Sequence, residues 1–251
     1  WMEGILKSFA DTVYVQKANV VQVKLGKTYP VINLIASFNP QATDRVLILA
    51  HWDSRPWADE DKQDKDKPID AADDGGSGVA VMMEMAARMK AQKPKVGVDL
   101  LFEDVEDVGK TEWSEDSYCV GTQYWARNPH VPGYRAMFGI CLDMVGARGA
   151  RFPLEGQSAN YAGSVQREVW ETARHIGYGN YFVMEEGSSI VDDHIPINTI
   201  LKIPCIDIVN LKPNGAFADH WHTHQDKLEI IDRATLKAVG QTVMTVLYNQ
   251  D

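Results

Sequence analysis

Apolar segments of strand length alternate with amphipathic segments of helix length along this chain of 251 residues. Strands are predicted at 45–50, 96–102, 136–142 and 203–209, and helices at 4–17, 76–90, 159–176 and 232–249. Strands that alternate with helices favour a mostly parallel sheet covered by helices on both faces. We therefore expect the α/β class. The chain 1–251 should form a single α/β/α domain around a central mixed, mostly parallel sheet, with an N-terminal helical segment (1–20) packing on it.

Composition excludes several classes of protein. The chain is 45% hydrophobic and 24% charged, which is typical of a globular protein and not of a disordered one. It carries 25 Lys and Arg against 35 Asp and Glu, a formal charge of −10, and so lacks the basic surplus that neutralises nucleic-acid phosphates. Its apolar runs, such as 46–50, are too short to span a bilayer. We expect no nucleic-acid partner and no membrane span in this chain.

Two other features are expected to be structural. The three cysteines, Cys119, Cys141 and Cys205, form no CxxC pair and no disulfide framework, and the last two lie in apolar runs typical of a core. The stretch 59–67 is rich in charges of both signs, which indicates a solvated loop.

Histidine and carboxylate side chains follow the four predicted strands. In chain order they are His51 and Asp53, the acidic stretch 103–107, Asp143, and Asp207, which follows the apolar run 203–206. Ligands bind beyond the carboxyl ends of the strands in open α/β sheets, and a buried polar group there must be solvated, paired or bound to a metal. His51 and Asp53 lie two apart on a strand and so face the same side, where the carboxylate can orient the imidazole.

Two further clusters supply groups of the same kind. One directly precedes the helix predicted at 76–90 and the other lies near the C-terminus; their members are Asp73 and Asp74, and His220, His222 and His224. Histidine and carboxylate ligands without thiolates are typical of a catalytic Zn²⁺ site, which keeps coordination positions open for substrate. Asp73 also fits an ordinary turn or helix cap, and His220 and His224 are interpreted as structural neighbours of the central histidine.

These motifs occur in the order in which zinc peptidases of the M28 clan carry them. They are His51-Trp-Asp53-Ser54, Asp74-Gly-Gly-Ser-Gly78, Glu106-Asp107, Leu142-Asp143, Asp193-His-Ile-Pro196 and Trp221-His222-Thr223. Within that clan the chain resembles the glutaminyl-peptide cyclotransferases (glutaminyl cyclases), specifically bacterial members similar to the animal enzymes, from about residue 45 to 230. The resemblance implies a zinc aminopeptidase-like fold and cyclisation of the N-terminal glutamine of peptides and proteins to pyroglutamate, with release of ammonia.

The resemblance also implies a role for each matching position. One Zn²⁺ per chain would be held by Asp74, Asp107 and His222, while Glu106 would act as general base and acid. The active-site carboxylates of the hydrogen-bond network near that base would be Asp143 and Asp193. The aromatic residues of the substrate pocket would be Trp113, Trp221 and Phe217. The groups beside the zinc, or at a possible second metal position, would be His51, Asp53 and Asp207.

The chain departs from the animal enzymes in a few places. Asp107 stands where they have Glu, and Asp207 stands where they have His. The segment before Trp113 is one residue longer, and the cysteine pair of the animal enzymes is missing.

One alternative activity stays open, namely a two-zinc aminopeptidase of the same clan. In that enzyme Asp74 would bridge two ions and Glu106 would activate water, with the further metal positions His51, Asp107, Asp143 and His222. Trp221 before His222, the segment 113–117 and the motif at Asp193 favour the cyclase. A catalytically inactive binding module is disfavoured, because the chain keeps the base and all five metal positions.

The proposed reaction explains the residue types. The glutamine supplies both the nucleophilic amine and the electrophilic carbonyl, so the enzyme needs a Lewis acid and a proton shuttle but no attacking water. The expected partners are peptides or proteins with N-terminal Gln, and we expect a monomer. The resemblance to exported bacterial enzymes implies a periplasmic or otherwise extracytoplasmic site, although no signal can be read from the sequence beginning at Trp1.

Overall fold

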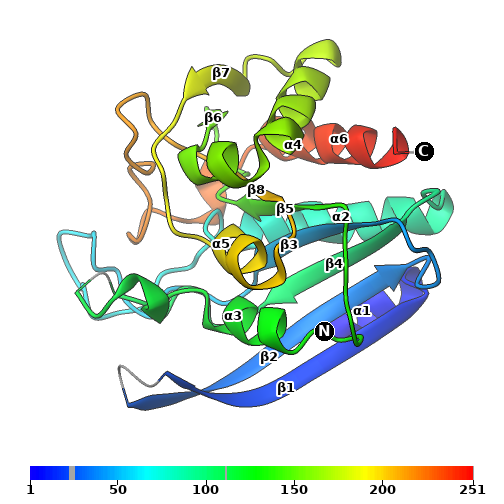
Figure 1. Cartoon of the computed structure of the whole chain (residues 1–251). Coiled ribbons are helices and arrows are strands. Elements are labelled where there is room, and N and C mark those ends of the chain that lie inside the picture. Colours follow the sequence, from blue (N-terminus) through cyan, green and yellow to red (C-terminus); the bar gives the residue numbers. More distant parts are fainter. Residues whose placement is uncertain (23–25, 111, 251) are drawn as a thin grey trace.

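A six-stranded sheet forms the centre of the protein, in the order β1-β2-β4-β3-β5-β8 (Figure 1). The structure is a computed structural model that describes residues 1–22, 26–110 and 112–250. The strands are β1 (Thr12–Gln22), β2 (Lys27–Phe38), β3 (Arg45–His51), β4 (Gly97–Glu103), β5 (Phe138–Asp143) and β8 (Cys205–Val209). Strands β4, β3, β5 and β8 run parallel, whereas β2 pairs antiparallel with β4 and with β1. The predicted mixed, mostly parallel sheet is confirmed.

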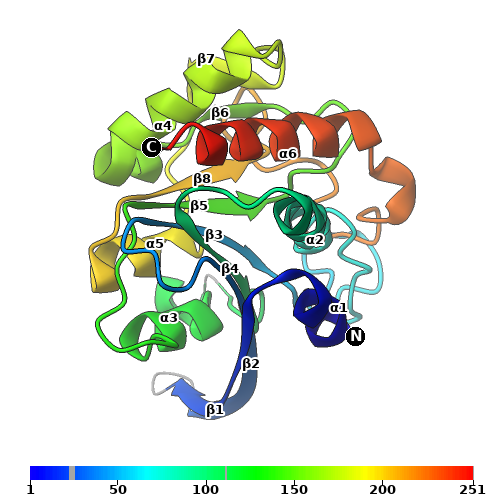
Figure 2. The same cartoon turned by 90° about the vertical axis from the view of Figure 1, so that its right-hand side faces the viewer.

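Helices cover both faces of this sheet (Figure 2). On one face lie α2 (Gly76–Ala91), α4 (Gly156–His175) and α6 (Arg233–Tyr248), with α1 (Met2–Phe9) at the end of this layer. On the other face lie α3 (Val120–Arg127) and α5 (His194–Pro196), which continues into a π-helical turn, Ile197–Leu201. The remaining elements are a small parallel pair, β6 (Phe152–Leu154) with β7 (Phe182–Glu186), and the 3-10 turns Glu115–Ser117 and Leu228–Ile230.

Strand β3 shows why the sheet is buried on both sides. Successive side chains of a strand point to opposite faces. Val46, Ile48 and Ala50 pack in the core cluster shared with α2, α4 and α6, while Leu47 and Leu49 pack in the cluster that contains Trp125 of α3. After Arg45, β3 is therefore apolar from Val46 to Ala50, and it ends at His51, where the strand meets the carboxyl edge of the sheet.

The N-terminal prediction is wrong beyond Phe9. A helix was predicted at 4–17 within a helical segment at 1–20, but α1 ends at Phe9 and β1 begins at Thr12. The sequence from Thr12 to Val15 is Thr-Val-Tyr-Val, and β-branched and aromatic residues favour strands. β1 then pairs along its whole length with β2, a strand that the sequence pattern did not predict.

No helix in the described part of the chain is both long and apolar enough to cross a membrane. The parallel strands β4, β3, β5 and β8 bring their carboxyl ends to one edge of the sheet, and the loops that follow them meet there. That edge is where the predicted functional residues should be found.

Candidate functional site

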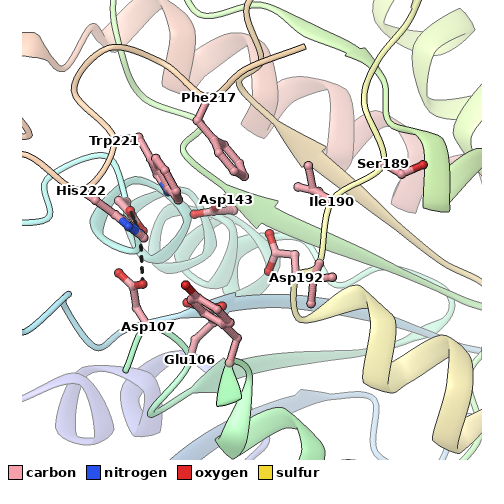
Figure 3. Close-up of a pocket in the computed structure, with 12 residues that line it drawn as sticks. Glu106, Asp107, Asp143, Ser189, Ile190, Asp192, Phe217, Trp221 and His222 are labelled. Carbon is pink, nitrogen blue, oxygen red and sulfur yellow. Dashed lines mark ion pairs between the residues drawn. The ribbon is translucent and has the colours of Figure 1, made fainter. Parts of the chain in front are cut away.

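A pocket of about 250 Å³ opens at the carboxyl edge of the parallel strands (Figure 3). Its polar lining consists of five carboxylates, one imidazole and one hydroxyl: Asp74, Glu106, Asp107, Asp143, Asp192, His222 and Ser189. Its apolar and aromatic lining consists of Tyr118, Ile190, Val191, Phe217 and Trp221. The pocket thus combines a dense group of acids with a flat aromatic wall.

Three of the lining residues form a cluster that could hold a metal ion. His222 Nε2 lies 3.2 Å from Asp107 Oδ1 and 3.6 Å from Asp74 Oδ2, and all three residues are buried. Within the described residues, Asp74 Oδ2 and Asp107 Oδ2 have no hydrogen-bond partner. Buried carboxylate oxygens without partners are costly unless a cation binds them. Two carboxylates and one imidazole are a donor set that Zn²⁺ accepts with an open coordination position.

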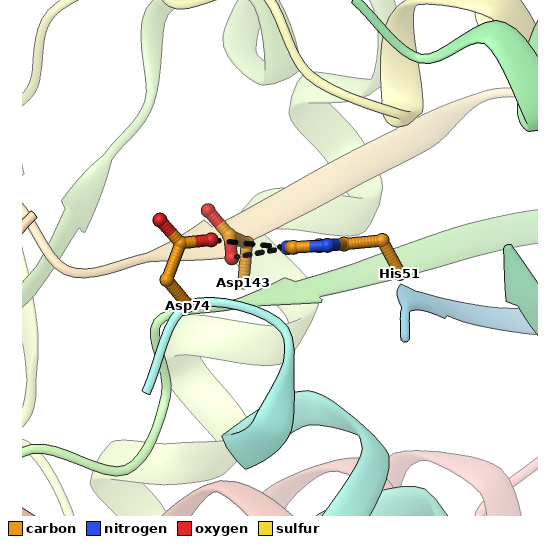
Figure 4. Close-up of side chains that lie close together, drawn as sticks. All are labelled: His51, Asp74 and Asp143. Atoms are coloured by element: carbon orange, nitrogen blue, oxygen red, sulfur yellow. Dashed lines mark hydrogen bonds and ion pairs between the residues drawn. The ribbon is translucent and has the colours of Figure 1, made fainter. Parts of the chain in front are cut away.

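The other oxygen of Asp74 faces a second group (Figure 4). Asp74 Oδ1 lies 3.2 Å from His51 Nε2, which in turn lies 3.4 Å from Asp143 Oδ1. The backbone must come close to His51 here, because a Cβ at Gly75 would lie 2.8 Å from the ring atom Cε1. Gly75 also has a φ of 87°, which favours glycine. The Asp74 carboxylate therefore lies between two histidines.

Asp226 fixes the backbone that carries Asp74. Its two carboxylate oxygens accept the backbone N–H groups of Asp73 at 2.7 Å and of Asp74 at 3.0 Å. The Asp73 carboxylate accepts the N–H of Gly146 at 2.7 Å and lies 2.8 Å from His220 Nε2. Asp73 and His220 are thus engaged away from the pocket, in line with their interpretation as structural residues.

Glu106 and Asp107 are positioned by contacts on both sides of their loop. Asp53 accepts the backbone N–H groups of Glu106 and Asp107, and its Oδ1 also lies 3.7 Å from His51 Nδ1. On the opposite side, the Cys119 thiol donates to Glu106 Oε1 at 3.5 Å, and the Cys119 backbone N–H donates to the Glu106 carbonyl at 3.0 Å.

Three of the pocket carboxyls, those of Glu106, Asp143 and Asp192, resist ionisation. Burial, followed by the neighbouring charge of Asp107, raises the pKa of Glu106 well above its usual range. Burial likewise raises the pKa of Asp143 and of Asp192. Carboxyls that lie this close to one another hold protons in common. Glu106 is therefore suited to accept and return a proton.

The structure corrects the prediction for Asp193. Asp192 lines the pocket, whereas Asp193 is fully buried behind it and accepts a hydrogen bond from the Thr122 hydroxyl. Burial and the adjacent Asp192 raise the pKa of Asp193 to about 7. Asp207 is also fully buried, in β8, where burial, followed by the neighbouring charge of Asp192, raises the pKa of its carboxyl well above the usual range. The two adjacent aspartates point in different directions, which the sequence alone does not reveal.

Two of the three aromatic residues predicted for the substrate pocket, Phe217 and Trp221, line the pocket in the structure. Phe217 and Trp221 stack with ring centroids 4.4 Å apart, and Trp221 stacks on His222 at 3.8 Å. Trp113 does not line the pocket; it packs against Trp57 and lies under the Lys27 ammonium. Tyr118, five residues later in the chain, lines the pocket instead.

Sequence reasoning also missed Arg55 and Asp59. Asp59 begins the charged stretch expected to be a solvated loop, yet it is only partly exposed and pairs with the buried Arg55. The one available signal was the position of Arg55, two residues after the His51-Trp-Asp53 motif.

Four residues at the pocket adopt left-handed backbone conformations without being glycine. They are Val105, Cys119, Met144 and His222, with φ angles of 60°, 55°, 48° and 54°. Each lies beside or within the groups described above, and such conformations are typically found where function fixes a side-chain direction.

Comparison with known proteins agrees with this geometry. Residues 33–247 match the model of peptidase family M28. Glutaminyl-peptide cyclotransferase from Bos taurus is 27% identical over 233 residues, which cover 81% of this chain and 62% of the bovine protein. The chain spans less than two thirds of the length of the first curated relatives that it matches.

Solved structures match along the whole chain. Bacteroides thetaiotaomicron glutaminyl cyclase, solved with bound N-acetylhistamine, is 42% identical with a TM-score of 0.96 and covers 100% of this chain and 88% of its own. A Zn-dependent exopeptidase from Parabacteroides distasonis is 45% identical with a TM-score of 0.95 and covers 99% of this chain and 88% of its own. The chain therefore belongs to peptidase family M28, as a relative of the bacterial glutaminyl cyclases.

Proposed function

We propose that this chain is a zinc-dependent glutaminyl-peptide cyclotransferase, which converts the N-terminal glutamine of peptides and proteins to pyroglutamate. One observation carries the proposal: a single pocket holds a buried acid of raised pKa, Glu106, beside the cluster of Asp74, Asp107 and His222 and the stacked rings of Phe217 and Trp221. The whole-chain likeness to glutaminyl cyclases supports it.

Asp74, Asp107 and His222 would hold one zinc ion through the oxygens that lack other partners and through Nε2. When bound, zinc supplies a Lewis acid for the γ-carbonyl oxygen of the glutamine. Glu106 accepts a proton from the α-amine as its nitrogen forms a bond to the γ-carbonyl carbon. The same residue then returns the proton to the amide nitrogen as the bond from carbon to that nitrogen breaks, so that ammonia leaves.

The rest of the pocket would select and fold the substrate. The flat walls of Phe217 and Trp221 suit a small side chain with an apolar stem, and they hold it in the conformer that closes the ring. Asp143 and Asp192 face the same space, and burial raises the pKa of both carboxyls, which favours the form that donates a hydrogen bond to the reacting amide. We assign to Asp192 the role that the motif had predicted for Asp193.

A two-zinc aminopeptidase is the second candidate. The observation that favours it is the Asp74 carboxylate, which directs one oxygen toward His222 and the other toward His51, as a bridging ligand does. The number of zinc ions and the reaction product separate the two activities.

The test is to incubate the zinc-loaded protein with a peptide that begins with Gln. The release of ammonia is then measured, and the mass of the peptide is determined by mass spectrometry. We expect loss of one ammonia molecule from the peptide, one tightly bound zinc per chain, and loss of activity after chelation that added zinc restores. A matched peptide beginning with Leu should stay intact. Release of free N-terminal residues with two bound zinc ions would establish the aminopeptidase, and two unchanged peptides would contradict both candidates.

The proposal extends to the setting of the reaction. We propose that the protein acts as a monomer at an extracytoplasmic site on peptides with N-terminal Gln. Light scattering of the purified protein and fractionation of the source cells would test the two parts separately.

A further inference from the structure

Arg55 is a buried cation that contacts one of the proposed zinc ligands. Only 1% of its side chain is exposed. Its Nη1 donates to Asp107 Oδ1 at 3.0 Å and to the carbonyl oxygens of Asp107 and Gly109 at 2.9 Å each. Asp107 Oδ1 is therefore engaged by the guanidinium and also lies 3.2 Å from His222 Nε2, while Asp107 Oδ2 has no partner among the described residues. Arg55 thus determines which oxygen of Asp107 remains available for a metal.

The same guanidinium also holds Asp59. Arg55 Nε donates to Asp59 Oδ1 at 3.0 Å and Nη2 donates to Asp59 Oδ2 at 2.6 Å, which is a two-point contact of fixed geometry. Asp59 Oδ1 in turn lies 3.5 Å from His222 Nδ1. The backbone adds to this contact, since the N–H of Glu60 donates to the His222 carbonyl at 3.3 Å.

The contact at Nδ1 determines how His222 can act. A metal-binding histidine commonly engages a carboxylate with its other ring nitrogen, which fixes the tautomer and the ring orientation. With Asp59 at Nδ1, the lone pair of Nε2 faces Asp107 and Asp74. Arg55 thereby connects the carboxylate behind one ligand with the side chain of another.

Charge supports the same interpretation. One guanidinium lies between two carboxylates, Asp59 and Asp107, so the group as a whole carries one negative charge toward the site. A buried arginine beside a metal ligand would oppose cation binding if its charge were not compensated. Asp59 provides that compensation.

We propose that Arg55 and Asp59 are a positioning pair for the zinc site, which presents Asp107 Oδ2 and His222 Nε2 to the metal. The inference rests on the zinc site of the proposed function. It assigns no contact with substrate to either residue.

The experiment uses Asp59→Asn. Loss of the Arg55 side chain would leave two carboxylates without their cationic partner and is expected to destabilise the fold by itself. Asparagine keeps an oxygen for the guanidinium but removes the charge behind His222. The control is Asp66→Asn, which makes the same change of charge at an exposed position of the same loop. Zinc affinity is measured by competition with a chromophoric chelator, and the thermal midpoint of the metal-free protein is measured in parallel.

We expect Asp59→Asn to lower zinc affinity by about 10- to 100-fold, the range found when such supporting contacts are lost. The metal-free protein should keep its thermal midpoint, and the visible spectrum of the Co²⁺-substituted protein should change. Asp66→Asn should match the wild type in all three measurements.

Two results would overturn the inference: wild-type zinc affinity in Asp59→Asn, or a loss of affinity equal to that of Asp66→Asn. A wild-type protein that binds no zinc would instead contradict the proposed function, so the two failures are distinguishable.

Discussion

Asp53 Oδ1 accepts the backbone N–H of Glu106 at 3.0 Å, so the carboxylate that was predicted to orient His51 also fixes the position of the proposed base. Its second oxygen accepts the N–H of Asp107 at 3.1 Å. Each oxygen of one side chain thus holds one of the two residues on which the proposed chemistry depends. This dual role is possible because β3 and β4 are parallel neighbours, so that Asp53 and Glu106 follow adjacent strand ends.

Asp53→Asn should impair both stability and turnover. The amide keeps one acceptor oxygen, but its NH₂ group is a donor. It would face one of the two backbone N–H groups without accepting a hydrogen bond from it. We expect a loss of about 1–3 kcal/mol in the free energy of unfolding and a lower kcat. Urea unfolding and ammonia release measure the two effects, with the exposed Asp44→Asn as control. Equal stability of the two variants would contradict the importance of these hydrogen bonds.

Glu106→Gln should abolish proton transfer without loss of zinc. Glutamine has nearly the same shape as glutamate but cannot accept the proton of the α-amine. We expect kcat to fall by about 10²- to 10⁴-fold while the zinc content stays that of the wild type. Stopped ammonia assays and metal analysis of the same sample provide the measurement. Loss of zinc together with activity would show that Glu106 maintains the metal site and would contradict its role in proton transfer.

Asp192→Asn and Asp193→Asn should differ in what they change. Asp192 lines the pocket, so its variant should lose most of its kcat and keep its thermal midpoint. Asp193 is fully buried and already tends to be protonated, because burial raises its pKa to about 7. Asn at 193 should therefore retain the greater part of the activity. The reverse order of activities would restore the role that the sequence motif predicted for Asp193.

Asp104 should make stability depend on pH. Burial raises its pKa from 3.8 to about 6, although its Oδ2 accepts the N–H of Ile32 at 2.7 Å. The folded state therefore binds the proton more tightly than the unfolded state. The stabilisation is complete below pH 4 and is lost as the pH rises to about 6, by at most about 3 kcal/mol.

Asp104→Asn does not titrate but keeps an acceptor oxygen for Ile32. Its free energy of unfolding relative to the wild type should thus increase between pH 4 and pH 6, as measured by urea unfolding at several pH values. A difference that is constant over this range would show that Asp104 ionises as it does in the unfolded chain.

Long periodic segments were predictable from sequence because burial alone determines their pattern. The buried strand β3 and helix α2 lie within one residue of their predicted ends. The strand that begins at Thr12 was not predictable in this way, because its alternation of buried and exposed residues is weak. β1 is only partly buried along its length and depends on pairing with β2. Pairing between strands is a tertiary contact that a local pattern does not encode.

At the site, the motifs that resemble those of the M28 clan predicted Asp74, Asp107 and His222 as one group, and the structure brings these three residues together. They did not decide between Asp192 and Asp193, since the choice depends on how the short α5 leaves the loop before it. They also missed Arg55, whose partners lie 52 and 4 residues away. A buried ion pair of this kind has no periodic signature in the chain.

The left-handed backbone at Val105, Cys119, Met144 and His222 limits how stable this protein can become. Each such residue costs about 1–2 kcal/mol relative to an ordinary conformation. Glycine at these positions would relieve the strain but would free the loops that direct Glu106, Asp143 and the His222 ring. Selection for heat resistance should therefore enrich substitutions elsewhere in the chain. A change that relaxes any of these four backbone conformations would stabilise the protein but reduce its turnover.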